Sequence, residues 1–357
     1  MGWHRSWPLE FSPSGAGDDP QWKGFTLGVE LDDLQRTPLH RRSFISCLGA
    51  VAASFGGMGC RRGRELVVGI HPWIGYETLY LARGFKWLPP TVRFHEGGSV
   101  SDLMAPLRAG TLDAACLTLD ETLRARAEGL PLKVVLVFDA SAGADAVLAR
   151  PGIRKLADLR GKRLGVERNA LGALMLAKVL ESSGLEASDL ILVEIPIEQH
   201  VAAWRRNDLD AVITFEPTST FLLREGAHVI FDSRQVPETV FDVLAVRADR
   251  IPDRRSALGA LVAGHFRGLA HLQTNRQDSI YRIAARQGVT PEEVQRALSG
   301  ILLPSLPGNR AYLASPDSRL LAAARTVSGI LVKSGDLKRE ASLEGLVDPT
   351  WLPRDGG

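Results

Sequence analysis

The sequence has little cysteine, almost no charge excess of either sign, and no long apolar run beyond its N-terminal region. Its three cysteines, Cys47, Cys60 and Cys116, stand singly and far apart, which excludes a CxxC metal or redox motif. Lys and Arg total 43 against 41 for Asp and Glu, and no basic run is interleaved with aromatics, so charge gives no reason to expect nucleic acid as a partner. After residue 60 no apolar stretch approaches the ~20 residues of a membrane span.

Motifs that mark common enzyme classes are also missing. The chain contains no GxSxG, GxxxxGK[ST] or HExxH, and no GxGxxG follows its first predicted strand. His71, His95 and His200 fall near predicted strand ends, but their spacing matches no metal motif, so we expect no metal and no cofactor. Cys116 lies in an apolar run, which favours a buried core thiol.

Residues 39–60 contain a basic pair, an apolar stretch and a cysteine in the order that is typical of an export signal. Residues 41–45 read RRSFI, which resembles a twin-arginine signal, and Phe44 to Met58 is apolar and uncharged. The end at Gly59-Cys60 resembles a lipoprotein cleavage site, although Gly57 stands where that pattern prefers Leu. We expect export to the periplasm by the twin-arginine or the general secretory route, a lipid anchor on Cys60, and a disordered extension over residues 1–38.

From Glu65 onward, short apolar strands alternate with amphipathic helices, a pattern typical of an α/β protein with largely parallel sheets. The predicted strands are Leu66–Ile70, Val92–His95, Leu112–Thr118, Leu132–Phe138, Arg163–Glu167, Leu190–Ile195, Leu209–Thr214 and Val229–Phe231. The sequence from 252 to 333 is predicted to be helical. Residues 346–357 are predicted to be a loose tail.

The alternating pattern occurs twice. Leu112-Asp113-Ala114 recurs as Leu209-Asp210-Ala211, and 43 positions separate Gly69 from Leu112 while 44 separate Gly165 from Leu209. This spacing predicts two similar lobes rather than one long sheet. We expect the first lobe at 64–143 plus 241–345 and the second at 144–240, with hinge strands at 144–149 and 239–247.

In open α/β sheets ligands bind beyond the carboxyl ends of the strands. The residues at those ends include His71, Glu121, His200 and Thr214, which are not among the candidate ligand contacts. The candidate ligand contacts are Trp73, Tyr76, Ser99, Thr118, Asp120, Asp139, Glu167, Asn169, Leu171 and Glu216. Each has a structural alternative: Trp73 as an edge of the core, Asp120 as a helix N-cap, Asp139 as a turn residue.

The charge of the ligand stays open at this stage. The helix expected to begin at Asn169 presents free N–H groups that suit an anion. A cationic or hydrogen-donating group is favoured instead by the acids Asp120, Glu121, Asp139, Glu167 and Glu216. An amphoteric or amine-bearing ligand satisfies both.

Four runs carry a family resemblance: VGIHPWIGYETLYLARG (68–84), SDLMAPLRAGTLDAACLTLDE (101–121), GADAVLARPGIRKLADLRGKRLGVE (143–167) and DAVITFEP (210–217). They resemble the periplasmic binding proteins of the nitrate/sulfonate/taurine type and their thiamine-precursor-binding relatives. The resemblance covers about residues 65–335. It implies a two-lobed hinge fold, ligand contacts at Trp73, Asp120, Glu216 and the helix opened by Asn169, and delivery to an ABC permease.

The function expected from this resemblance is capture of a sulfonate-, nitrate- or thiamine-precursor-like solute by a monomer, without chemistry. One alternative is an enzyme on the same fold, although the cysteine-rich motif of the fungal thiamine-pyrimidine synthases is absent. The other is a ligand sensor for a signalling partner, which nothing in the chain distinguishes from a transport receptor.

Overall fold

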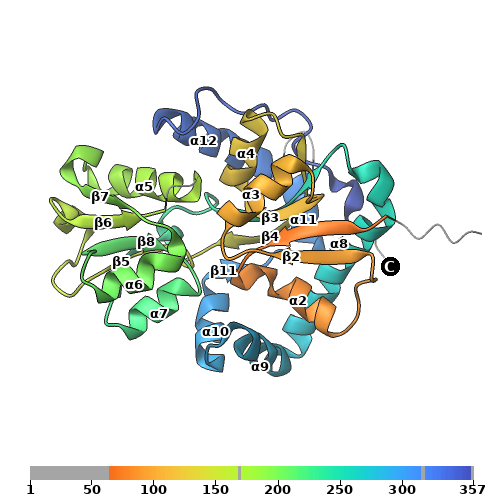
Figure 1. The fold of residues 1–357 in the computed structure, drawn as a ribbon, viewed down its shortest axis with the longest axis horizontal. Coiled ribbons are helices and arrows are strands. Elements are labelled where there is room, and N and C mark those ends of the chain that lie inside the picture. The colour runs from red at the N-terminus through yellow and green to blue at the C-terminus, as the bar shows by residue number, and fades with distance from the viewer. Residues whose placement is uncertain (1–63, 168–169, 315–317, 355–357) are drawn as a thin grey trace, which may run out of the picture. The chain divides into compact units, whose positions relative to one another are not determined.

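The computed structural model describes residues 64–167, 170–314 and 318–354. Several expectations lie outside these residues: the extension 1–38, the signal 39–60 with Cys60, and the candidate Asn169. The described residues belong to one unit, Arg62–Gly357. Two β-sheets organise it (Figure 1).

The first sheet contains six strands within the described residues. Their order across the sheet is β11 (Ile301–Leu302), β4 (Leu132–Ser141), β10 (Phe241–Arg247), β3 (Ala114–Thr118), β1 (Leu66–Ile70) and β2 (Val92–Glu96). Strand β1 is parallel to β2 and β3, whereas β10 is antiparallel to β3 and β4. The carboxyl ends of β1, β3 and β4 therefore meet at one edge of the sheet.

The second sheet repeats this plan. Where the structure is described, its order is β7 (Ile191–Glu194), β6 (Arg163–Val166), β8 (Ala211–Thr214), β5 (Ala146–Ala149) and β9 (His228–Asp232). Strand β6 is parallel to β7 and β8, whereas β5 is antiparallel to β8 and β9. In both sheets the strand that arrives from the other sheet, β10 or β5, runs antiparallel to both of its neighbours. The predicted two-lobed α/β fold is thereby confirmed, and each sheet with its helices is called a lobe below.

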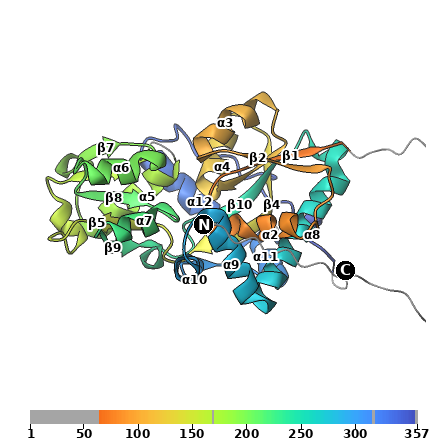
Figure 2. The ribbon, with the colours of Figure 1, turned by 60° about the horizontal axis from the view of Figure 1, so that its bottom comes forward.

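Helices pack around both sheets (Figures 1 and 2). Those of the first lobe are α2 (Glu77–Gly84), α3 (Val100–Ala109), α4 (Leu119–Ala127), α8 (Ile251–Thr274), α9 (Arg276–Gln287), α10 (Pro291–Ser299), α11 (Leu306–Leu313) and α12 (Arg319–Lys333). Those of the second lobe are α5 (Ala170–Ser183), α6 (His200–Arg205) and α7 (Thr218–Arg224). The predicted helical region after 252 is confirmed. Over the described ranges, no helix is both long enough and apolar enough to cross a membrane.

The aspartate of the repeated Leu-Asp-Ala signature joins neighbouring strands in each lobe. Asp113 Oδ2 accepts a hydrogen bond from the backbone N–H of Val67, with a donor–acceptor distance of 2.9 Å. Asp210 Oδ2 accepts the equivalent bond from Arg163 N at 2.8 Å. The duplicated sequence thus marks a duplicated connection, between β1 and β3 in the first lobe and between β6 and β8 in the second.

The leucine of the signature lies over a glycine of the adjacent strand. A Cβ placed on Gly69 would stand 2.7 Å from Leu112 Cδ1, and one on Gly165 would stand 2.9 Å from Leu209 Cδ1. Both distances are too short for carbon atoms in van der Waals contact. The near-equal spacing between glycine and leucine in the two halves therefore reflects the same packing contact.

The chain passes between the sheets twice, from β4 to β5 and from β9 to β10. The two crossings are tied together: Ser141 Oγ lies 2.7 Å from Ser233 Oγ, and the N–H of Gly143 donates to Ser233 Oγ at 2.7 Å. The segments 144–149 and 239–247 consist mainly of β5 and β10, which pair within the sheets. The free crossings are therefore the shorter stretches just before these two strands.

Residues 346–354 are not a loose tail, so that prediction is wrong. Val134 N donates to the carbonyl of Leu346, Asp348 N donates to the carbonyl of Val134, and Leu346 is fully buried. The following helical turn, η6 (Pro349–Trp351), packs against β4. The segment is too short to carry a periodic pattern, and its order comes from pairing with a distant strand.

Candidate functional site

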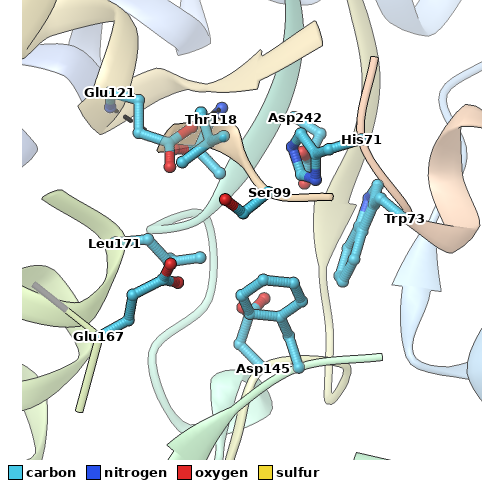
Figure 3. A pocket seen from close by; sticks show the side chains of 11 residues that line it. His71, Trp73, Ser99, Thr118, Glu121, Asp145, Glu167, Leu171 and Asp242 are labelled. Atoms are coloured by element: carbon cyan, nitrogen blue, oxygen red, sulfur yellow. Dashed lines mark hydrogen bonds between the residues drawn. The ribbon is translucent and has the colours of Figure 1, made fainter. Parts of the chain in front are cut away.

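A narrow cavity lies between the lobes, where β1, β3 and β6 end. Figure 3 shows the residues that line it: His71, Trp73, Ser99, Val100, Thr118, Glu121, Asp145, Glu167, Leu171, Phe215 and Asp242. In this arrangement of the lobes the cavity has a volume of about 20 Å³, so a solute larger than a water molecule enters only when the lobes separate. Its position beyond the carboxyl ends of the strands is where open α/β sheets bind ligands.

An aromatic pair from the two lobes forms one wall. Trp73, which follows β1, meets Phe215, which follows β8, edge to face with ring centroids 5.8 Å apart. Trp73 Nε1 donates to Asp139 Oδ2 at 3.0 Å, which holds the indole in place. A Cβ on Gly75 would stand 1.8 Å from that carboxylate oxygen. The wall therefore depends on a glycine in the turn after Trp73.

The register of the first sheet brings polar side chains together. Asp242 on β10 stands opposite Thr118 on β3 and opposite Asp139 on β4. The hydroxyl of Tyr76 donates to Asp242 Oδ1. All four side chains are buried. Three neighbouring strands thus place two carboxyl groups side by side beneath the cavity.

Asp145 ends the first crossing between the lobes. Its backbone N–H donates to Ser141 Oγ at 3.2 Å, and its carbonyl accepts from the N–H of Ser233 at 2.9 Å. The residue is 2% exposed, and its Oδ2 atom has no hydrogen-bond partner in the described part of the chain. Asp145 therefore presents an unsatisfied acceptor from the hinge to the cavity.

The start of α4 supplies two further lining residues. Glu121 accepts a hydrogen bond from Thr118 N at 2.9 Å, and Thr118 Oγ1 accepts one from Glu121 N, which forms a capping box. The expectation that Asp120 caps this helix is wrong, because Thr118 is the N-cap residue. Asp120 follows within the first turn of the helix and is fully buried.

Burial controls the ionisation of these groups. It raises the pKa of Asp242 well above its usual range, with neighbouring Asp139 adding to the effect, and raises the pKa of Glu121 as well. Burial raises the pKa of Asp145 from 3.8 to about 6. Burial also lowers the pKa of His71 to about 4, so its imidazole is neutral at pH 7.

Five of the candidates from the sequence line the cavity: Trp73, Ser99, Thr118, Glu167 and Leu171. Tyr76, Asp120 and Asp139 are buried and are not among its lining residues. Glu216 lines a different cavity, next to the first crossing, and accepts a hydrogen bond from Thr220 N. Asn169 lies outside the described residues.

Other lining residues were absent from the candidate set. His71 and Glu121 follow predicted strands, whereas Val100, Asp145, Phe215 and Asp242 are cavity residues that the structure adds. Asp145 and Asp242 share a signal that was available: each is a lone acid inside an apolar segment that links the lobes. Burying an ionised acid in an apolar core costs free energy, so an acid in such a segment indicates that the segment borders a polar cleft.

The histidines do not assemble a metal site. Across the ranges the structure describes, no group of three or more His, Cys, Asp or Glu side chains has an arrangement that could hold a metal ion. His200 lies within hydrogen-bond distance of Thr214 Oγ1 and of the carbonyl of Ile195, so both ring nitrogens have partners inside the second lobe.

Comparison with known proteins gives a family and a set of relatives. The family model described as NMT1/THI5 like matches residues 91–278. The taurine-binding periplasmic protein of Escherichia coli (strain K12) is 26% identical over 162 residues, which cover 44% of this chain and 50% of the relative. The match thus spans only half the length of that protein.

Solved structures share the fold. The alkanesulfonate-binding protein SsuA of Xanthomonas axonopodis pv. citri, bound to MOPS, superposes with a TM-score of 0.66 at 20% identity, covering 80% of this chain and 98% of the other. The desulfurization enzyme DSZB superposes with a TM-score of 0.58 at 16% identity, covering 81% and 98%. At this identity the similarity concerns the fold, which binding proteins and an enzyme both use.

Proposed function

The chain belongs to the NMT1/THI5-like family, and from that membership and the cleft we propose that it is the substrate-binding component of an ABC importer. It captures a small polar organic solute between its lobes and delivers it to a permease in the inner membrane. The observation that carries the proposal is the cavity lined from both lobes. A solute held there bridges two bodies that are joined by two short crossings.

Ligand capture then works by a population shift. The unliganded protein opens at the crossings near Ser141 and Ser233, and a solute that contacts both lobes favours the closed arrangement. Trp73 from one lobe and Phe215 from the other contact each other across the cleft. A solute that packs against this pair gains contacts from both lobes at once, which is the differential binding that closure requires.

Capture proceeds without bond making or breaking. The hydroxyls of Ser99 and Thr118 are not hydrogen-bonded to His71 in the described structure, so no nucleophile–base pair is formed there. Cys116 is fully buried on β3, and burial raises the pKa of its thiol well above the usual range. A protonated core thiol is not a nucleophile. These features favour a receptor over an enzyme on the same fold.

Native mass spectrometry of protein purified from its own host tests the proposal. We expect a small-molecule adduct that is released chemically unchanged on denaturation. Replacing Trp73 by Ala should weaken rebinding of that molecule roughly tenfold or more, because it removes an aromatic wall of the cleft. The control is Trp87→Ala, whose ring stacks on Phe85 away from the cavity. A converted product, or equal effects of both variants, would contradict the receptor function.

We also propose a periplasmic location, reached through the signal over residues 39–60, with a lipid anchor on Cys60. Cell fractionation followed by mass spectrometry of the N-terminal peptide should find the mature protein in the membrane fraction with acylated Cys60. Cys60→Ser should move it to the soluble periplasmic fraction. Cytoplasmic protein with residues 1–60 intact would refute both the location and the anchor.

A further inference from the structure

The cavity between the lobes is lined by acids. Its described lining residues include the four carboxyl groups of Glu121, Asp145, Glu167 and Asp242, and no Lys or Arg (Figure 3). They come from α4, the first crossing, the end of β6 and β10, so they surround the space from both lobes. His71 adds no positive charge, because burial keeps its imidazole neutral.

One of these carboxyl groups has an oxygen atom that is available to accept a hydrogen bond from a ligand. Asp145 is almost completely buried, and its Oδ2 atom lacks a hydrogen-bond partner among the described residues. His71, which also lines the cavity, has a buried Nε2 atom that likewise lacks a hydrogen-bond partner among the described residues. A buried polar atom without a hydrogen-bond partner costs free energy, and a bound donor removes that cost. A donor on a bound molecule would satisfy Asp145.

We propose that the protein holds its solute by a protonated nitrogen that donates to Asp145 Oδ2, with Glu121, Glu167 and Asp242 around it. The solute is thus an organic cation or a zwitterion with an ammonium group. This inference rests on the proposed function, since it names the class of solute that the same cleft captures. The carbon skeleton packs against Trp73 and Phe215, and an aromatic face also attracts a neighbouring cation.

The surroundings of Asp145 set the pH dependence of this binding. Burial and Glu121 disfavour its ionised form, while a hydrogen bond from Ser141 favours it. Asp139 and Asp242 lie on β4 and β10, which pair with each other in the first sheet, and Asp242, His71 and Glu167 line the same cavity as Asp145. A bound cation reverses the balance and favours the ionised carboxylate. Binding should therefore tighten as the pH rises through about 6, the pKa of Asp145 in the free protein.

Two probes of nearly equal shape test the charge requirement. Taurine carries an ammonium and a sulfonate, and isethionate replaces the ammonium with a hydroxyl group. Isothermal titration at pH 7.5 should show taurine binding roughly tenfold or more tighter than isethionate. Asp145→Asn should remove most of this preference. The matched control, Asp253→Asn, changes a carboxylate that pairs with Arg64 on the exposed surface and should leave the preference intact.

The outcomes separate this inference from the proposed function. Isethionate binding as tightly as taurine overturns the inference and leaves the receptor function standing. So does an Asp145→Asn variant that folds and keeps the full preference. If neither probe binds, the molecule that co-purifies from the host decides: a protonatable nitrogen in it supports the inference, and its absence overturns it. If nothing binds or co-purifies, the proposed function itself fails.

Discussion

The carboxyl groups of the cleft illustrate how a single residue acquires its properties from its neighbours. Asp242 and Asp139 are ordinary aspartates in apolar strands, but antiparallel pairing of β10 and β4 puts them at the same register. Burial raises the pKa of both carboxyl groups well above the usual range, and the neighbouring charge of Asp139 adds to the effect at Asp242. Tyr76 and Trp73 each donate a hydrogen bond into this pair and so keep it anchored.

Asp145 should make the stability of the ligand-free protein fall with pH. The pKa of its carboxyl group is 3.8 in the unfolded chain and about 6 in the folded protein. Between these two pH values the folded state therefore binds more protons than the unfolded state. The free energy of unfolding therefore decreases as the pH rises from about 4 through about 6 and then levels off. The loss is on the order of 3 kcal/mol, since one pKa unit corresponds to about 1.4 kcal/mol.

Urea denaturation across this pH range measures the effect in comparison with Asp145→Asn. The variant should gain stability relative to the natural protein as the pH rises, because its amide does not ionise. Asp253→Asn, at an exposed ion pair, should follow the natural protein. A difference between Asp145→Asn and the natural protein that stays constant with pH would show that this carboxyl group does not titrate as argued.

At the scale of elements, the first lobe depends on a close crossing of α2 and α8. The backbone of α2 approaches Gly268 of α8 so closely that an added Cβ would lie 2.1 Å from the carbonyl oxygen of Thr78. Beside it, Thr78 Oγ1 and His265 Nδ1 are 2.8 Å apart, and both side chains are buried. The helices can approach to this distance because glycine has no side chain at the crossing.

Two glycines of α8 should respond in opposite directions to replacement by alanine. Gly268→Ala should destabilise the protein by about 1–3 kcal/mol or more, because the methyl group forces α2 and α8 apart. Gly259→Ala should be neutral or stabilise by up to about 1 kcal/mol, since apart from the adjacent residues and backbone of its own helix no described atom lies within 4 Å of the position its methyl group would take, and alanine favours the helix. Urea denaturation of both variants checks this, and equal effects would refute the close crossing.

At the scale of the whole described molecule, contacts between the lobes determine how easily the cleft opens. Helix α5 of the second lobe touches α4 and α12 of the first, and Arg224 of α7 forms a bidentate ion pair with Glu293 of α10. The side chain of Arg224 is 44% exposed. Such a pair contributes at most about 1 kcal/mol, which suits a contact that the proposed opening of the cleft would break.

Arg224→Ala should shift the ligand-free protein toward an open arrangement. Loss of roughly 0.5–1 kcal/mol changes the ratio of open to closed protein about two- to fivefold, which small-angle X-ray scattering detects as a larger radius of gyration. Arg205→Ala is the control, because Arg205 pairs with Glu225 inside the second lobe. The prediction fails if both variants keep the radius of gyration of the natural protein.

Much of the fold could be predicted from the sequence because its signals are local. Strand and helix periodicity and the duplicated Leu-Asp-Ala signature indicated two α/β lobes, and the rule that ligands bind beyond strand ends selected Trp73, Ser99, Thr118, Glu167 and Leu171, which line one cavity. Each of these signals depends on residues close together in the chain, and neighbouring residues keep their relation whatever the rest of the molecule does.

Only the tertiary structure decided which acids face the cleft. Asp145 and Asp242 reach it because the chain crosses between the lobes at those points, whereas Asp139 and Asp120 are buried behind it. The direction of each side chain follows from strand register and from the pairing of segments about 100 residues apart, such as β4 and β10. That information is absent from local patterns, since a shift of one residue in register reverses which face a side chain occupies.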